Sequence, residues 1–346
     1  MSTSDPIKFA VVGSGYIGKR HAETILENPN SLLVAICDNS LQRAEETSHF
    51  GVPFYNSLEE MISNGPEFDV LCIATPNSLH AEHAITGLEN KKHVVIEKPM
   101  ALTKSDCERI IFKSLQVSKQ VFCVMQNRYS PPSVWIKDIV NQGLLGQVFM
   151  VQVNCYWNRD SRYYNGNTWK GKSDFDGGTL FTQFSHFVDV MYWLFGDITD
   201  IQSRFKDFNH NNLTEFEDSG FVSFNFKNGA IGAINYSTSI WDKNMESSLV
   251  IIAENGTVKI GGQYMNVVEY CHIKDYKMPE LAPSNPPNDY GSYKGSASNH
   301  HLFYKNVIDT LQSKDTITTN ALEGLKVVEM IEKIYEQNPY FKSKKK

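Results

Sequence analysis

The segment Gly13-Ser14-Gly15-Tyr16-Ile17-Gly18 follows an apolar run, Ile7 to Val12, and precedes a stretch with helical character. A second apolar run, Leu32 to Cys37, leads to Asp38, which lies twenty residues beyond the last glycine. Glycines at this spacing between a strand and a helix, with an acid after the next strand, are the fingerprint of a dinucleotide-binding turn. They allow a tight turn and close approach of a pyrophosphate, whose charge the N–H groups of the helix N-terminus favour. The sequence therefore predicts a dinucleotide site that includes Gly13, Gly15, Tyr16, Ile17 and Gly18.

The acid at the end of the second strand indicates which dinucleotide binds. The carboxylate of Asp38 can accept hydrogen bonds from both ribose hydroxyls of NAD and would repel the 2′-phosphate of NADP. Arg43 is the first basic residue after it and could in principle reach such a phosphate, but a solvated helix arginine is the simpler interpretation. The sequence therefore predicts NAD as the cofactor.

The composition is ordinary for a soluble globular protein of one large or two medium-sized domains, with 346 residues, 41% hydrophobic and 21% charged. The net charge of −6 provides no general basic surface, so neither nucleic acid nor a membrane is expected as a partner. The first residues, Met1 to Pro6, lack the basic and apolar character of a signal peptide, and no apolar run is long enough to cross a bilayer. We expect a cytoplasmic protein.

The six cysteines are expected to be reduced thiols. Four of them lie in apolar segments with strand character, where cysteine behaves as a small hydrophobic residue. The spacing fits neither a disulfide framework nor a zinc-binding pattern, so no metal site is expected. The four core cysteines are Cys37, Cys72, Cys123 and Cys155.

Apolar strands alternate with helices over residues 1–127. Continuous apolar runs such as Val70 to Ala74 and Val94 to Ile96 are typical of a parallel sheet that is covered on both faces. In such sheets ligands bind beyond the carboxyl ends of the strands, and polar residues follow several of these runs. The predicted cofactor site therefore also includes Asp38, Thr75, Asn77, Glu97, Lys98 and Gln126, and the resemblance of the segment Thr75 to His80 to a known family implies that His80 joins them.

The pattern changes after Pro131-Pro132, and residues 128–346 are predicted to form a second domain. A helix at about Val134 to Gln142 precedes a long alternating strand, Gln147 to Trp157. Further short strands separated by turns predict an open, mostly antiparallel sheet. Residues 277–295 are interpreted as a long loop, and two helices close the chain. An open sheet has a face that is wet or covered by another subunit, so a homodimer or homotetramer is expected.

A buried helix predicted over residues 178–195 carries polar residues on one face. His186 shares this face with Thr182, Gln183 and Asp189, which lie three or four positions away. A buried polar group must be hydrogen-bonded or functional. His186 is therefore either a catalytic base or a core histidine held by Asp189.

Lys98 ends a core strand beside the expected position of the nicotinamide. The Pro99 that follows restricts the Lys98 backbone to extended geometry. Lysines are seldom buried unless paired, and near NAD a lysine can hydrogen-bond the oxygen that is oxidised. The alternative is a salt bridge with Glu97.

These motifs together resemble the Gfo/Idh/MocA family, named after glucose–fructose oxidoreductase and inositol dehydrogenase. The resemblance rests on the glycine-rich turn, Thr75 to His80, Glu97-Lys98-Pro99 and the His186-x-x-Asp189 helix, and it covers nearly the whole chain. It implies a doubly wound α/β Rossmann domain over residues 1–127 and an α+β domain over residues 128–346 whose open sheet forms the oligomer contact. It also implies that Lys98 and His186 are the catalytic pair.

A closer resemblance is to bacterial UDP-N-acetyl-D-glucosaminuronate 3-dehydrogenases, which make a keto sugar for surface-polysaccharide synthesis. It implies NAD-dependent oxidation at the sugar C3 hydroxyl. Two departures bear on the site. Thr182 stands where many family members have aspartate, which makes inositol a less suitable substrate, and Lys170 stands where arginine is common, so a phosphate there meets only a point charge. The motifs are Gln126 to Tyr129, Tyr156 to Arg159, Tyr163-Tyr164, Trp169 to Gly171, Phe175 to Gly178 and Gln183 to His186.

A uronate carboxylate needs a cation, for which Arg159 and Arg162 are the candidates, with solvated loop charges as the alternative. Reduction of a 3-keto deoxysugar nucleotide, or oxidation of another sugar or a polyol, remains a second possibility. A non-catalytic NAD-sensing regulator is a third, although Lys98 and His186 are both present. The expected substrate site comprises Lys98, Arg159, Arg162, Thr182, Gln183 and His186, and Trp169 and Lys170 are expected to join the cofactor site.

Overall fold

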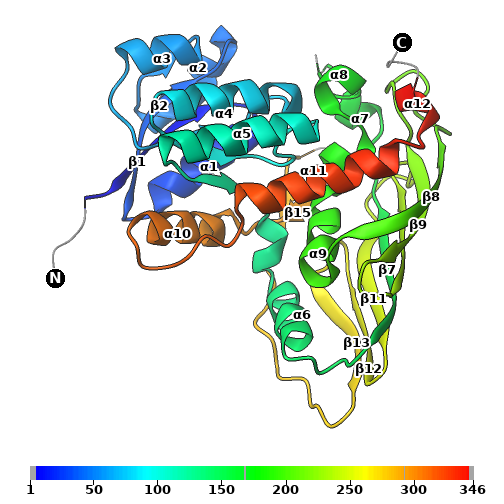
Figure 1. Cartoon of the computed structure of the whole chain (residues 1–346). Coiled ribbons are helices and arrows are strands. Elements are labelled where there is room, and N and C mark those ends of the chain that lie inside the picture. The colour runs from blue at the N-terminus through cyan, green and yellow to red at the C-terminus, as the bar shows by residue number, and fades with distance from the viewer. Residues whose placement is uncertain (1–4, 167–168, 292, 343–346) are drawn as a thin grey trace. The chain divides into compact units, whose positions relative to one another are not determined.

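The computed structural model describes residues 5–166, 169–291 and 293–342, which form two compact units (Figure 1). The first unit contains the chain up to Met125 together with His300–Val328, and the second contains Gln126–Asn299 and the chain from Glu329 onward. The expected domains, 1–127 and 128–346, did not include this return of residues 300–328 to the first unit. The return has a physical cause, because helix α10 (His300–Leu311) packs against helix α1 (Tyr16–Glu27).

The first unit is built on a parallel six-stranded sheet in the order β3-β2-β1-β4-β5-β6. This is the strand order of doubly wound dinucleotide-binding folds, and the parallel sheet predicted from the continuous apolar runs is confirmed. All four residues of β4 are buried, as expected of a strand covered on both faces. The strands are β1 (Ile7–Val12), β2 (Ser31–Cys37), β3 (Phe54–Tyr55), β4 (Val70–Ile73), β5 (His93–Ile96) and β6 (Val121–Cys123).

Helices connect these strands, and their starting points follow local capping rules. The hydroxyl of Thr103 accepts a hydrogen bond from the N–H of Asp106 and so begins α5, and Ser57 begins α3 in the same way.

Helix α11 packs closely against β6, because a Cβ on Gly324 of α11 would lie 2.5 Å from the sulfur of Cys123. The remaining helices are α2 (Leu41–Thr47), α3 (Leu58–Asn64), α4 (His80–Glu89), α5 (Lys104–Val117) and α11 (Ala321–Tyr335), whose last residues belong to the second unit.

The second unit is built on a seven-stranded sheet in the order β13-β12-β11-β7-β10-β9-β8 (Figure 1). All neighbouring strands are antiparallel except β7 and β10, so the predicted open and mostly antiparallel sheet is confirmed. Alternate residues of β7, β9 and β10 are buried, as the alternating pattern of β7 predicted. The strands are β7 (Val148–Tyr156), β8 (Ile198–Lys206), β9 (Ser219–Phe226), β10 (Ile231–Ser237), β11 (Glu246–Ala253), β12 (Gly256–Gly261) and β13 (Val267–Ile273).

The helices of this unit are short, and the end of the chain is fastened to it by a buried carboxyl group. The hydroxyl of Tyr335 donates to Glu217 Oε1 at 2.6 Å, and the amide of Asn338 donates to Glu217 Oε2 at 2.8 Å. Burial raises the pKa of Glu217 to about 7, although these donors oppose the shift. The helices are α6 (Pro131–Asn141), α7 (Ser161–Tyr164), α8 (Ser173–Asp176), α9 (Ser185–Phe195) and α12 (Pro339–Lys342).

Two segments differ from the expectation. Residues 178–195 do not form one continuous α-helix, because Leu180–Phe184 form a wider π-helical turn before α9 begins at Ser185. The regular spacing assumed for Thr182 and His186 therefore does not apply across this turn. Residues 277–295 are not a plain loop, since they contain β14 (Pro287–Asp289) and the first half of its antiparallel partner β15 (Lys294–Ala297).

The cysteines agree with the expectation from the sequence. All six cysteines are free thiols, and burial raises the pKa of Cys72 to about 12. In the part of the chain that the structure describes, no helix has the length and apolar character that a membrane span requires.

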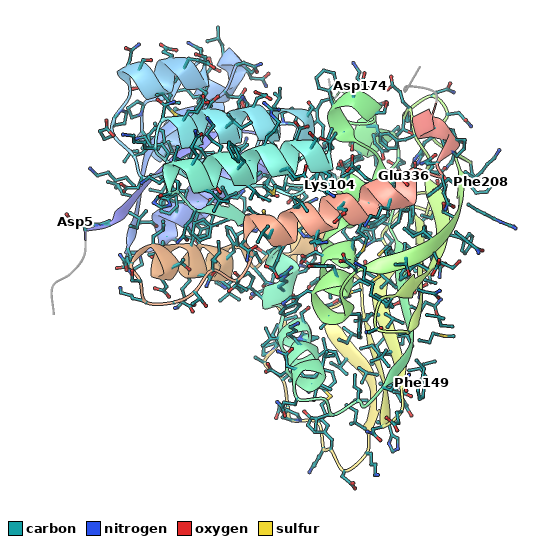
Figure 2. The ribbon with its side chains drawn as sticks, viewed as in Figure 1. Asp5, Lys104, Phe149, Asp174, Phe208 and Glu336 are labelled. Atoms are coloured by element: carbon teal, nitrogen blue, oxygen red, sulfur yellow. The ribbon has the colours of Figure 1, made fainter. Side chains whose placement is uncertain are left out.

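Apolar side chains adjoin one another on three neighbouring strands of the second unit's sheet. Met150 of β7 pairs with Ile231 of β10 on one side and with Ile252 of β11 on the other. These three side chains, which we call the outer patch, are 40% to 50% exposed. Phe149, beside Met150, is also exposed (Figure 2).

We expect a second copy of the chain to cover the outer patch, because symmetric self-association is the commonest cover for an exposed apolar surface. Met150→Glu would place a charge in that contact and should reduce the molar mass measured by light scattering at micromolar concentration to that of a monomer. Leu41→Glu changes an apolar residue that is 74% exposed in the first unit and should leave the mass unchanged. A monomeric wild-type protein at the same concentration would contradict the expectation.

Candidate active site

The glycine-rich turn after β1 has the geometry that a dinucleotide requires. Gly13 adopts a φ of +85°, and a Cβ there would lie 2.6 Å from the backbone of Ala74. A Cβ on Gly18 would lie 1.8 Å from the carbonyl oxygen of Gly13, so no side chain fits. Gly15, in contrast, has no atom within 4 Å of its Cβ position. Two glycines are therefore required by the turn and by helix packing, and the third leaves open space beside the N-terminus of α1, which suits a pyrophosphate.

Asp38 lies at the end of β2 and is tied to the same turn. Its carboxylate accepts hydrogen bonds from the backbone N–H of Ser14 at 2.7 Å, from the Ser14 hydroxyl at 3.1 Å and from the N–H of Ser40 at 3.0 Å. Arg43 is paired with Glu46 at 2.5 Å, which agrees with its interpretation as a helix-surface arginine. The carboxylate of Asp38 is held at the position where it can contact the ribose of NAD. Because Arg43 is paired with Glu46, the 2′-phosphate of NADP would meet the negative charge of Asp38 without a neutralising arginine.

Replacing Asp38 with alanine should therefore narrow the preference for NAD over NADP. The carboxylate no longer repels the 2′-phosphate, so affinity for NADP should rise relative to that for NAD, as measured by titrating both cofactors. Asp38 also accepts hydrogen bonds from Ser14, so Asp38→Ala could loosen the glycine-rich turn as well as remove the ribose contact. The variant Ser14→Ala removes the hydroxyl bond to Asp38 and retains the carboxylate, so it shows the effect of a loosened turn alone. Ser14→Ala should weaken both cofactors alike. Equal affinities of the wild-type protein for NAD and NADP would contradict the assignment of Asp38 as the residue that selects NAD.

The ends of β4 and β5 are joined by His80. Its Nδ1 lies 2.7 Å from the carbonyl oxygen of Pro99, and its Nε2 lies 2.9 Å from that of Thr75. Burial lowers the pKa of His80, whereas these two carbonyl contacts oppose the shift. Asn77 is buried in the turn that precedes α4. His80 thus holds together two of the segments expected to contact the cofactor, and a direct contact between its ring and NAD stays a prediction.

The side chain of Glu97 is buried inside the first unit. Its Oε1 lies 2.9 Å from Nε2 of His21, and its Oε2 accepts a hydrogen bond from the backbone N–H of Lys98 at 3.1 Å. Burial would raise the pKa of Glu97, but hydrogen bonding and the charges of His21 and His300 hold it well below its usual value. The carboxylate proposed as the alternative partner of Lys98 is therefore engaged with histidine, and through its N–H bond it helps to fix the Lys98 backbone.

In the second unit, His186 lies in the first turn of α9 and is 2% exposed. The carboxylate of Asp189, three residues further, accepts two hydrogen bonds from the guanidinium of Arg128, at 2.9 Å and 2.6 Å. Arg128 and Asp189 are themselves buried, so this bidentate ion pair neutralises the acid. The motif Gln126-Asn127-Arg128 can be recognised in the sequence because it follows a strand. No nearby residue indicates that Arg128 pairs with Asp189, which lies 61 positions away. Gln126, expected at the cofactor site, is buried in this unit.

The neighbours of His186 form two separate hydrogen-bonded groups. The hydroxyl of Thr182 donates to the carboxylate and the backbone carbonyl of Asp176. The side-chain oxygen of Gln183 accepts from Arg159 Nε at 2.7 Å, and its amide nitrogen donates to the hydroxyl of Tyr163 at 2.8 Å. Thr182 thus contacts a carboxylate, that of Asp176.

Arg159 is a buried cation, and its hydrogen-bond partners among the described residues are neutral. Its guanidinium lies about 5 Å from the rings of Trp157, Tyr163 and Tyr293, at 4.8, 5.2 and 5.0 Å. It donates only to neutral oxygens, those of Gln183, Asn158, Asn244 and Lys294. Among the described residues no carboxylate lies within the 4.0 Å of an ion pair with it. Burial lowers its pKa, but an arginine stays protonated, so the positive charge persists.

The other two cations named from the sequence have different surroundings. Arg162 is half-exposed and pairs with Asp160 at 2.7 Å and Asp242 at 3.3 Å, so its charge is already neutralised. Lys170 lies over the same rings as Arg159, with Nζ 4.0 Å from the centre of the Tyr163 ring. Trp169 next to it is partly exposed. The second unit therefore brings Arg159, Gln183 and Lys170 together around Tyr163, whereas Lys98 belongs to the first unit. The pairing of Lys98 with His186 stays a prediction.

Comparison with known proteins shows the family to which the chain belongs. Residues 7–124 match the family model described as the oxidoreductase family with an NAD-binding Rossmann fold, and residues 134–259 match the GFO/IDH/MocA C-terminal domain. The chain is similar to the WlbA dehydrogenase from Bordetella pertussis in complex with NADH and UDP-GlcNAcA, with 31% identity, a TM-score of 0.84 and 96% of each chain covered. It is also similar to the WlbA dehydrogenase from Chromobacterium violaceum with the same ligands, with 28% identity, a TM-score of 0.86 and coverage of 96% and 94%.

A sequence relative with a different substrate is the inositol 2-dehydrogenase of Salmonella typhimurium. It is 29% identical over 199 residues, and the match covers 55% of each chain. The family models together span most of the chain, and the six-stranded parallel sheet carries the glycine-rich turn where a dinucleotide binds. The chain therefore belongs to the Gfo/Idh/MocA family and is an NAD-dependent oxidoreductase.

Proposed function

We propose that this protein oxidises the C3 hydroxyl of a UDP-N-acetylhexosaminuronate. The observation that carries the proposal is Arg159, a buried guanidinium with only neutral partners, in contact with Gln183 three residues before His186. A buried charge without a counter-charge is costly unless a ligand supplies one. The carboxylate of a uronate sugar has the charge required. The likeness to two dehydrogenases whose structures contain UDP-GlcNAcA supports the same substrate class.

The reaction removes a hydride from carbon and a proton from oxygen. Bound NAD supplies the hydride acceptor at its nicotinamide ring. His186 accepts the hydroxyl proton, as a neutral imidazole can near neutral pH. Lys98 hydrogen-bonds the same oxygen and stabilises the negative charge that develops there, so that a ketone forms at C3. The contribution of the protein is to orient the hydroxyl and to provide these charges.

The carboxylate proposal predicts a selective effect of Arg159. Arg159→Met should raise KM for a UDP-N-acetylhexosaminuronate by about 10–100-fold, because a charge-assisted hydrogen bond contributes about 1.5–3 kcal/mol. The uncharged analogue UDP-N-acetylglucosamine should be affected much less, and steady-state formation of NADH with both substrates measures the difference. Arg162→Met is the parallel variant and should have the smaller effect, since Asp160 and Asp242 already neutralise Arg162.

Loss of folding must be distinguished from loss of recognition, because Arg159 is buried. Arg159→Lys retains the charge and should recover part of the preference for the uronate. Equal losses with both substrates in Arg159→Met would remove the carboxylate contact from the proposal. Oxidation of a free polyol, as by the inositol dehydrogenase relative, would then be the next activity to test. No NADH with any sugar in the presence of tight NAD binding would indicate a non-catalytic NAD sensor.

A further inference from the structure

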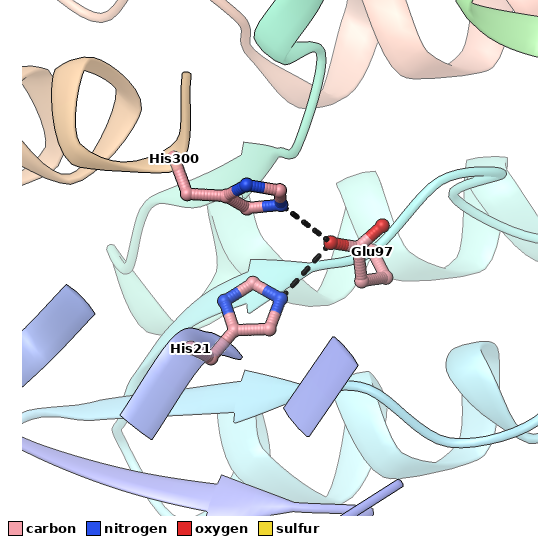
Figure 3. Close-up of side chains that lie close together, drawn as sticks. All are labelled: His21, Glu97 and His300. Atoms are coloured by element: carbon pink, nitrogen blue, oxygen red, sulfur yellow. Dashed lines mark hydrogen bonds and ion pairs between the residues drawn. The ribbon is translucent and has the colours of Figure 1, made fainter. Parts of the chain in front are cut away.

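Three side chains with metal-binding groups meet inside the first unit. His21 comes from α1, Glu97 follows β5, and His300 begins α10 (Figure 3). Nε2 of His21 lies 2.9 Å from Oε1 of Glu97, and Nε2 of His300 lies 3.6 Å from the same oxygen. All three donor atoms lie within 4.8 Å of one another, and the side chains are 0%, 5% and 1% exposed.

We propose that the cluster His21–Glu97–His300 binds one divalent transition-metal ion of the zinc type. Two imidazoles and one carboxylate are a ligand set that zinc and neighbouring metals use. Metal–ligand bonds of about 2.0–2.2 Å at angles between 90° and 120° place the donor atoms about 2.9–3.6 Å apart. The two distances to Glu97 Oε1 fall in this range. The inference does not depend on the substrate proposed above.

A shared proton explains only part of this geometry. A proton between His21 and Glu97 accounts for the contact of 2.9 Å. It leaves both ring nitrogens of His300 without a hydrogen-bond partner within 3.5 Å among the described residues, although the ring is almost completely buried. Buried polar groups in this state are rare and destabilising. A single cation that contacts all three donors satisfies Nε2 of His300 together with the other two.

The atoms around the cluster hold the ligands in suitable orientations. Nδ1 of His21 lies 2.6 Å from the hydroxyl of Tyr304, which donates in turn to the sulfur of Cys72 at 3.2 Å. The Tyr304 oxygen therefore accepts the Nδ1–H of His21, and this tautomer directs the lone pair of Nε2 toward Glu97. The second oxygen of Glu97 accepts the N–H of Lys98. Outer hydrogen bonds of this kind accompany histidine and carboxylate ligands in metal sites.

Because the cluster is buried, the metal must be supplied while the protein folds. The full-length protein is produced with added zinc, dialysed against metal-free buffer and analysed for zinc by mass spectrometry. We expect about one zinc per chain, and a zinc-edge anomalous peak between His21, Glu97 and His300 in crystals. His300→Gln should lose the retained zinc. His93→Gln changes a partly buried histidine elsewhere in the first unit and should retain it.

A second variant keeps the test decisive if His300→Gln does not fold. Tyr304→Phe preserves the ring but removes the acceptor of the His21 Nδ1–H, and it should weaken zinc about 10–100-fold in competition with a chelator. Wild-type protein that retains no zinc after this preparation would overturn the proposal. Zinc retained equally by His300→Gln, or an anomalous peak at another position, would also overturn it.

Discussion

Replacing Lys98 with alanine should slow hydride transfer by about 10²–10⁴-fold while NAD binding stays largely intact. The expectation follows from the loss of a cation at the oxygen that becomes negative during oxidation, since removing one electrostatic or proton-handling group has effects of this size. In the first unit the Glu97 carboxylate contacts His21 and accepts the backbone N–H of Lys98. Stopped-flow formation of NADH measures the rate, and a cofactor titration measures NAD affinity.

Lys92→Ala is the matched control for this experiment. Lys92 also lies in the first unit and is mostly buried, but it pairs with Glu67 at 2.9 Å at the protein surface. It should retain the wild-type rate. A rate for Lys98→Ala within threefold of the wild type would refute a catalytic role for Lys98. A large loss of NAD affinity would instead indicate that Lys98 acts mainly on the cofactor.

The second large effect is expected at His186. An imidazole base must be deprotonated before it can accept the hydroxyl proton, so the oxidative rate of the wild-type protein should rise with pH and then level off. His186→Asn should abolish this rise and slow oxidation by about 10²–10⁴-fold, since asparagine retains polarity but cannot take up a proton. The rate per folded molecule across a pH series is the measurement.

A structural role for His186 predicts a different outcome. A core histidine would give a protein that is less stable by about 1–3 kcal/mol but whose folded fraction reacts normally. Melting temperature and rate per folded molecule therefore separate the two roles. His210→Asn, at another buried histidine of the second unit, shows how much destabilisation such a substitution causes without loss of rate. Normal turnover in His186→Asn would leave Lys98 as the only candidate for proton transfer.

The parts of the fold that could be predicted are those whose requirements are local. Gly13 and Gly18 are required by contacts with atoms a few residues away or on the adjoining strand, and continuous apolar runs are enough to indicate parallel strands. Asp38 was recognisable by its place after the second strand. The sheet of the second unit was predictable for the same reason, because apolar and polar residues alternate along β7 and so indicate one buried face and one exposed face.

The parts that could not be predicted depend on residues far apart in the chain. Arg128 and Asp189 are separated by 61 positions, and neither has a local feature that names its partner. The rings around Arg159 come from residues near 160 and from Tyr293, so the buried cation appears only once the fold is known. The wide π-helical turn at Leu180–Phe184 interrupts a segment whose sequence predicts one continuous helix. The cluster His21–Glu97–His300 could not be predicted, because its three residues are far apart in the chain and no local spacing connects them.

The return of residues 300–328 to the first unit determines an order of events during synthesis on the ribosome. The first 125 residues emerge without α10, so Phe9 lacks the ring of Tyr304, which lies 5.6 Å away in the finished protein. At about 5–20 residues per second, the segment Gln126–Asn299 takes on the order of ten seconds or more to translate. Throughout that interval the apolar side of α1 is exposed to solvent and chaperones. A nascent chain that stalls before His300 therefore lacks the contacts that α10 makes with α1 in the finished protein.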